Sequence, residues 1–255
     1  MDALIIAAGF GSRLRDISDS KPMTPIAGVP LLELGVRQAK AAGAQRVVVV
    51  TGHEAERLEA GLPALAQRAG IAVQAARVDD WSKPNGWSVI AGAEQISGNY
   101  LLMMSDHIFS APILSGLAQQ AAADRGVTLA VDCRIDDPLI DPDDATWVQR
   151  DDRGFIRAIG KTIPVYDAVD CGAFLCTPEL ARAIRGAIAA GQAGSLSEGM
   201  QRLADMGRAA TWEIGGAWWL DVDDPRAHAL AEDQAPRELA EVYAAALTSR
   251  PPASV

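Results

Sequence analysis

The chain has 255 residues, of which 49% are apolar and 22% are charged; this is enough for one substantial core and excludes a disordered or collagen-like protein. Its net charge of −10 opposes unspecific binding to nucleic acid or to anionic membranes, and no apolar run is long enough to predict a membrane span. The first residues lack the basic segment of a signal peptide, and the three cysteines form no CxxC pair. We therefore expect a cytoplasmic protein with reduced thiols and no structural metal.

The first hundred residues alternate between short apolar runs and longer amphipathic runs. The apolar runs predict buried strands at residues 3–8, 46–50, 71–78 and 100–104. The amphipathic runs predict helices at residues 30–43, 54–69 and 85–96. This alternation favours right-handed crossovers and hence a Rossmann-like α/β fold, whose mainly parallel sheet carries helices on both faces.

The alternation of predicted strands and helices ends after a further predicted strand at residues 127–133. Two strand-like pieces, 145–150 and 155–161, flank the hairpin signal Asp152-Arg153-Gly154. We therefore expect a small antiparallel insertion over about residues 134–176.

The C-terminal third returns to helical periodicity. Helices are predicted at residues 178–190 and 195–206, and again from Pro225, where Asp224 is the expected cap. The main domain then spans residues 1–234. A C-terminal helix at 237–247 and a frayed tail complete the chain at residues 235–255.

The first candidate for chemistry is the segment Gly9-Phe10-Gly11-Ser12-Arg13, directly after the first predicted strand. Glycines at a strand's carboxyl end let backbone amides approach a phosphate, and Arg13 and Lys21 supply positive charge. A dinucleotide site would add a third glycine and an immediate helix, and both are missing here. The alternative is an ordinary tight turn.

Two aspartates close apolar strands and suit a magnesium site. Asp106 follows the strand at 100–104, and Asp221 closes the segment Trp218-Trp219-Leu220. Mg²⁺ takes one or two carboxylates and keeps water and phosphate oxygens as its other ligands. The alternative for each aspartate is a cap or turn residue, and we expect His107 to be structural.

Two further segments allow both a binding and a structural interpretation. Lys161 follows Gly160, but the glycine spacing and Pro164 exclude a P-loop, which leaves a phosphate-binding cation or a solvated lysine. The segment 81–88 offers Gly86 and Ser88 to a nucleobase, or forms a helix entrance capped by Asn85.

These motifs together resemble the sugar-nucleotidyltransferase superfamily, whose signature is an apolar-Ala-Ala-Gly-x-Gly-x-Arg loop with a downstream Lys-Pro. Here the loop is Ile6-Ala7-Ala8-Gly9-Phe10-Gly11-Ser12-Arg13, followed by Lys21-Pro22. Five further segments are most similar to the CTP:inositol-1-phosphate cytidylyltransferases: 85–88, 104–107, 160–161, 170–172 and 219–223. The resemblance covers the chain to about residue 231.

The resemblance implies a role for each matched residue. It assigns the nucleotide to Ala8, Gly9, Gly11, Arg13, Lys21, Gly86, Ser88 and Asp106, with Arg13 and Lys21 as the catalytic cations. It assigns Mg²⁺ to Asp106 and Asp221, and the acceptor phosphate to Lys161, Asp170 and Gly172. Cys171 departs from the family, where Thr or Ala is usual, so the resemblance does not predict the shape of the acceptor pocket.

The implied reaction is the Mg²⁺-dependent transfer of a cytidylyl group from CTP to a phosphorylated polyol, inositol 1-phosphate, giving CDP-inositol and pyrophosphate. The alternatives are a nucleotidyltransferase with a sugar 1-phosphate or phosphocholine acceptor, and a nucleotide-binding regulator without turnover. Some relatives are fused to a membrane-embedded phosphotransferase that uses the product. We expect that partner, if there is one, to be a separate protein, and the sequence does not predict the oligomeric state.

Overall fold

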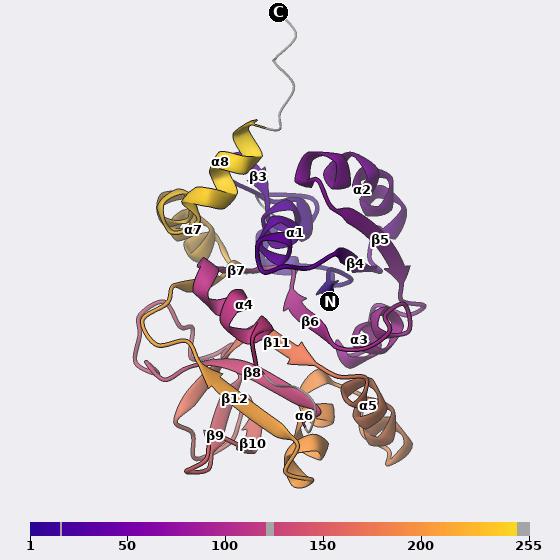
Figure 1. The fold of residues 1–255 in the computed structure, drawn as a ribbon, viewed down its shortest axis with the longest axis vertical. Coiled ribbons are helices and arrows are strands. Elements are labelled where there is room, and N and C mark those ends of the chain that lie inside the picture. The colour runs from indigo at the N-terminus through magenta and orange to yellow at the C-terminus, as the bar shows by residue number, and fades with distance from the viewer. Residues whose placement is uncertain (16, 121–124, 249–255) are drawn as a thin grey trace, which may run out of the picture.

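The computed structural model describes residues 1–15, 17–120 and 125–248. Figure 1 shows a twisted sheet through the middle of the molecule, with helices packed on both sides of it. The α/β fold class expected from the sequence is confirmed. The tail predicted to fray from residue 251 lies outside the described residues.

The main sheet has a parallel half and a largely antiparallel half. The parallel half consists of β1 (Asp2–Ile6), β4 (Arg46–Thr51), β5 (Ala72–Arg77) and β6 (Tyr100–Met104). The other half consists of β8 (Val127–Asp132), β9 (Trp147–Arg150), β10 (Ile156–Gly160), β11 (Ala168–Cys176) and β12 (Ala209–Glu213). The strand order is β10-β9-β11-β6-β1-β4-β5, with β8 between β11 and β12. The expected hairpin is present as the antiparallel pair of β9 and β10.

Two layers of helices cover the sheet because its strands are apolar on both faces. Ala3 and Ile5 of β1 contribute to one core, and Leu4 and Ile6 to the other, as the two-residue period of a strand requires. The first core is closed by α1 (Leu31–Ala41), α2 (Ala55–Ala69) and α4 (Ala111–Ala118). The second is closed by α3 (Gly86–Ala93), α5 (Glu179–Ala189) and α6 (Leu196–Asp205).

The C-terminal helices close a third apolar cluster. α7 (Pro225–Glu238) and α8 (Ala240–Thr248) pack beside α1 and over the short hairpin of β2 (Pro25–Ile26) and β3 (Val29–Pro30). Asp224 caps α7 as expected, because its carboxylate accepts a hydrogen bond from the Ala227 amide at 2.7 Å. The expected helix over 237–247 is broken at Leu239, and α7 runs through the expected domain boundary at residue 234.

A small antiparallel ribbon was not predicted from the sequence and proves central to the site. It pairs β7 (His107–Phe109) with β13 (Trp219–Asp221), so that His107 lies opposite Asp221 and Phe109 opposite Trp219. The sequence analysis also missed α4 and β12, whose apolar faces are too short to give a clear period. Among the described helices, none combines the length and the apolar character that a membrane crossing needs.

Candidate active site

The glycine loop ends β1 at the carboxyl edge of the parallel strands. A Cβ added to Gly9 would meet nothing within 4 Å, so packing inside the protein does not require this glycine, and the backbone is open to a ligand. Gly11 has a positive φ of 62°, and a Cβ there would lie 3.0 Å from Cδ of Lys21. Gly11 is therefore a glycine both for its backbone conformation and for the approach of Lys21. A 3-10 helix (Ser12–Leu14) follows Gly11 directly, and Lys21 begins a second 3-10 helix (Lys21–Met23).

Lys21 and Asp106 form an ion pair at the foot of this loop. The lysine Nζ lies 2.5 Å from Oδ2 of Asp106, and both side chains are less than one-fifth exposed. Burial lowers the pKa of Lys21, but the carboxylates of Asp106 and Asp221 outweigh it and raise the pKa. Burial would raise the pKa of Asp106, yet Lys21 and His107 hold it far below the ordinary value. Both groups are thus charged at neutral pH.

The β7–β13 ribbon brings the two expected metal aspartates together around His107. Nδ1 of His107 lies 2.9 Å from Oδ1 of Asp106 and 3.6 Å from Oδ1 of Asp221. Burial lowers the pKa of His107, but Asp221 and Asp106 raise it to a net value of about 9. The imidazole stacks against Trp219, with ring centroids 5.9 Å apart. The imidazole thus lies between the two carboxylates, close to both of them.

Asp144 joins Arg13, the cation expected on the nucleotide side, to Lys161, the cation expected on the acceptor side, and the sequence analysis missed it. Its Oδ2 lies 2.6 Å from Nη2 of Arg13, and its Oδ1 forms an ion pair with Lys161. Arg13 also pairs with Asp223. The burial of Asp223 and the charge of Asp221 raise its pKa to about 7. Asp141, Asp143 and Asp144 are alike in sequence, so only the fold could select one of them.

The acidic residues fit a divalent cation. Ligand atoms of Asp106, His107 and Asp221 lie within 4.8 Å of one another, and those of Asp144, Asp221 and Asp223 do the same. Oδ1 of Asp221 is buried and accepts no hydrogen bond from the described residues. A hard cation prefers such carboxylate oxygens. Asp106 and Asp221, the pair predicted from the sequence, are thus suitably placed.

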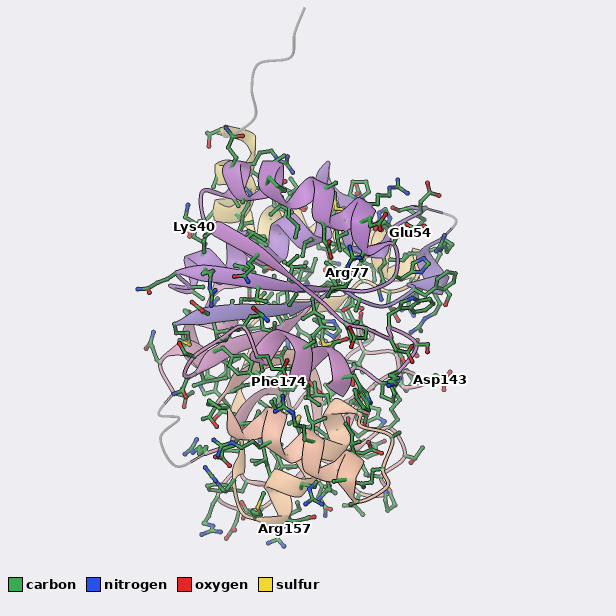
Figure 2. All side chains as sticks on the ribbon, turned by 90° about the vertical axis from the view of Figure 1, so that its right-hand side faces the viewer. Lys40, Glu54, Arg77, Asp143, Arg157 and Phe174 are labelled. Carbon is green, nitrogen blue, oxygen red and sulfur yellow. The ribbon has the colours of Figure 1, made fainter. Side chains whose placement is uncertain are left out.

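A cavity of about 360 Å³ lies beside these groups, and it is lined by the residues expected to bind the acceptor together with the two expected metal aspartates. Asp106, Lys161, Asp170, Gly172 and Asp221 all line it. Burial raises the pKa of Asp170 to about 6, although its Oδ1 accepts a hydrogen bond from the Gly172 amide at 2.7 Å. In Figure 2, Asp143 of the neighbouring loop and Glu54, which follows β4, lie on the same side of the molecule.

The structure explains why position 172 is a glycine, which the sequence alone did not. Its φ is +76°, and a Cβ there would overlap the ring of His107, 2.8 Å from both Cγ and Nε2. The glycine therefore gives His107 its place between the aspartates. Cys171 beside it is fully buried, so its side chain packs into the core instead of facing the cavity.

The structure does not bring Gly86 and Ser88 to the same cavity. Both are buried in α3, and a Cβ on Gly86 would overlap the Gly194 carbonyl. Asn85 lines the cavity and takes the expected N-cap position of α3. Its side chain makes no capping hydrogen bond to α3, because its Oδ1 accepts from the Leu196 amide at 2.9 Å. That Gly86 and Ser88 bind the nucleobase stays a prediction.

Two exposed aromatic rings flank the glycine loop. Phe10 and Trp81 are each more than two-fifths exposed, and their rings lie nearly parallel with centroids 6.3 Å apart. His53 contacts both edges, and the Arg15 guanidinium lies 4.2 Å over the Phe10 ring. Exposed aromatic rings can stack with a nucleobase, and these two lie beside the loop that is expected to bind phosphate.

With this geometry in place, similarity to known proteins decides the family. Residues 3–161 match the MobA-like NTP transferase domain family. The chain belongs to this family. The nucleotidyltransferase relationship expected from the glycine loop is therefore confirmed.

Two similar proteins with an assigned name carry the same one. The chain is 34% identical over 235 residues to a "Bifunctional IPC transferase and DIPP synthase" of Rubrobacter xylanophilus, covering 91% of this chain and 51% of that protein. A protein of the same name from Aquifex aeolicus is 27% identical, covering 88% of this chain and 49% of its own length. The chain thus spans about half the length of these relatives.

Solved structures share the fold. The "inositol-1-phosphate CTP transferase from T. maritima" superposes with a TM-score of 0.79 at 22% identity, covering 100% of this chain and 98% of that one. A UDP-glucose pyrophosphorylase reaches a TM-score of 0.76 at 16% identity, covering 91% and 98%. At these identities the likeness concerns the fold, which several nucleotide and acceptor combinations share.

Proposed function

We propose that this protein transfers a cytidylyl group from CTP to a phosphorylated polyol, with inositol 1-phosphate as the acceptor and CDP-inositol and pyrophosphate as products. The observation that carries the proposal is that three cations pair with carboxylates of one cavity. Lys161 lines the cavity together with Asp106, Asp144 and Asp221, while Lys21 pairs with Asp106 and Arg13 pairs with Asp144. Arg13 and Lys21 come from the glycine-loop side and Lys161 from the antiparallel side, while Asp106 and Asp221 lie between them. The names of the relatives support the choice of nucleotide and acceptor.

The acceptor phosphate supplies its own nucleophile. One of its oxygens attacks the α-phosphorus of CTP in line, the bond from that phosphorus to the bridging β-phosphate oxygen breaks, and pyrophosphate leaves. The phosphate is ionised at neutral pH, so no side chain needs to remove a proton. A Mg²⁺ ion held by Asp106 and Asp221 would neutralise part of the phosphate charge.

The chain's own cations perform the remaining work. Arg13 and Lys21 neutralise the triphosphate, and Lys161 holds the acceptor phosphate, so that two anions can approach each other. In the free protein each of these cations is paired with a carboxylate, and substrate phosphates take over those contacts. An acidic protein with a net charge of −10 can thereby accept polyanionic substrates locally.

The product is an activated polyol phosphate, which a phosphotransferase would consume. We propose that a membrane-embedded phosphotransferase carries out that step. The name of the bifunctional relatives, which includes a synthase, supports the pairing of the two activities.

The test is pyrophosphate release with CTP, Mg²⁺ and each of three acceptors: inositol 1-phosphate, glucose 1-phosphate and phosphocholine. We expect the highest kcat/KM for inositol 1-phosphate, and a loss of at least 100-fold in kcat for Asp106→Asn and Asp221→Asn with the fold retained. A higher kcat/KM for another acceptor would refute the acceptor assignment. No turnover with any nucleoside triphosphate would favour a nucleotide-binding regulator.

A further inference from the structure

A single carboxylate lies between the cations of the two substrate sides. Asp144 belongs to the segment between β8 and β9, whose residues 133–146 are all described and form neither helix nor strand. Its Oδ2 lies 2.6 Å from Nη2 of Arg13, and its Oδ1 forms an ion pair with Lys161, the residue that follows β10. One side chain therefore holds a cation from each substrate side.

The two cations hold Asp144 at a position that other acids oppose. Ligand atoms of Asp144, Asp221 and Asp223 lie within 4.8 Å of one another, and negative charges at this separation repel. Burial also raises the pKa of Asp144, but hydrogen bonds from Lys161 and Arg13 outweigh burial and hold the pKa far below its ordinary value. The position of this carboxylate therefore depends on both cations being available to it.

A triphosphate bound at Arg13 would remove one of these cations and add a negative charge. Phosphate oxygens compete with Asp144 for the guanidinium, and they repel the carboxylate at close range. Both carboxylate oxygens move together, so a side chain that turns away from Arg13 also leaves Lys161. The Asp144 side chain is 24% exposed, so it can turn toward solvent while the core stays packed.

The acceptor side gains a free cation from this movement. Lys161 lines the catalytic cavity, and in the free protein its charge is neutralised by Asp144. Once Asp144 has turned away, the ammonium can pair with the acceptor phosphate. Coupling between two binding events is mutual, so an acceptor phosphate at Lys161 favours the triphosphate at Arg13 by the same factor.

We propose that Asp144 is a positioning residue that couples the two substrates: it neutralises Lys161 until the triphosphate takes Arg13, and then releases Lys161 to the acceptor phosphate. The inference rests on the proposed function, in which Arg13 serves the nucleotide and Lys161 the acceptor. Asp143 offers a matched control, because it is exposed and forms no ion pair with any described residue.

The first test follows the lysine side chains by NMR. The chain has four lysines, so lysine-labelled protein gives few signals to assign: Lys21, Lys40, Lys83 and Lys161. The probe is the α,β-methylene analogue of CTP, added to protein that already contains Mg²⁺; its methylene bridge prevents the release of pyrophosphate. We expect the analogue to move the signals of Lys21 and Lys161 in the wild type and in Asp143→Asn. In Asp144→Asn it should move the signal of Lys21 only.

The second test measures the coupling by calorimetry. The Kd of inositol 1-phosphate is measured without and with the analogue, and the ratio of the two values is compared between proteins. This ratio should be about threefold to fivefold larger in the wild type and in Asp143→Asn than in Asp144→Asn, because a partly exposed ion pair is worth up to about that factor. Repulsion between the two bound substrates is common to all three proteins and cancels in the comparison.

Several results would overturn the coupling. One is a wild-type Lys161 signal that stays in place while Lys21 responds, and another is an equal movement of Lys161 in Asp144→Asn. Equal Kd ratios in the wild type and in Asp144→Asn would also overturn it. If Mg²⁺ alone moved the Lys161 signal as far as the analogue does, Asp144 would be a metal ligand instead. Should inositol 1-phosphate bind none of the three proteins while Lys161 responds as expected, the proposed acceptor alone would be wrong.

Discussion

Replacing Gly172 with alanine should separate backbone strain from damage to the active site. The residue has a φ of +76°, where an L side chain costs about 1–2 kcal/mol. The added Cβ would also lie 2.8 Å from Nε2 of His107. Carbon contacts prefer about 3.5–4.0 Å, so the imidazole must retreat by about 1 Å from its place beside Asp106 and Asp221.

Gly154 provides a matched control in the hairpin of β9 and β10. Its φ is +78°, and a Cβ there would meet only Oγ1 of Thr211, at 3.6 Å. Gly154→Ala therefore carries the same backbone strain without the collision. From about 2–4 °C per kcal/mol in a chain of this size, both variants should lose about 2–8 °C in Tm, with a larger loss for Gly172→Ala.

Activity should distinguish the two variants clearly. A displacement of about 1 Å in catalytic geometry can cost on the order of 100-fold, so we expect kcat of Gly172→Ala to fall by about that factor. Gly154→Ala should retain nearly the wild-type kcat. Pyrophosphate release at saturating substrates, with thermal unfolding of the same samples, makes the measurement. Equal kcat values for the two variants would refute the placement of His107 as a requirement for turnover.

Three other substitutions test different parts of the structure. Asp144→Asn should lower the acceptor KM roughly threefold to fivefold, since a partly exposed ion pair contributes up to about 1 kcal/mol, while the exposed Asp143→Asn should leave KM unchanged; a raised KM would instead mean that Asp144 contacts substrate. Trp81→Ala should raise the CTP KM about fivefold or more through lost stacking, and an effect on kcat alone would contradict this. Burial raises the pKa of Glu33, but hydrogen bonds and charges from Arg68 and Arg37 outweigh burial, so the net pKa is below the ordinary value. The ionised carboxylate therefore stabilises the fold at pH values above its ordinary pKa, and this stabilisation is lost as the pH falls. Glu33→Gln should accordingly lower the free energy of unfolding by about 3 kcal/mol at pH 7 and by less at pH 3, and chemical denaturation showing the same loss at both would refute it.

The sequence by itself determined the family and the parallel half of the fold. Strands such as Leu4–Ile6 and Val47–Val50 are apolar on both faces, and this pattern depends only on local composition and period. The glycine loop with Arg13 and Lys21 could be identified in the same way, because its residues are close in the chain. Asp106 and Asp221 were found for a similar reason, since each directly closes an apolar strand.

Only the tertiary structure decided which distant residues act together. Asp144 looks like its neighbours in sequence, and it matters because two folded segments place Arg13 and Lys161 on either side of it. Gly172 and His107 are 65 residues apart by number, so their contact has no local signal. The same holds for the ribbon of β7 and β13, whose two strands are about a hundred residues apart in the chain. Periodicity specifies which face of an element is buried, whereas these features depend on how elements pack against one another.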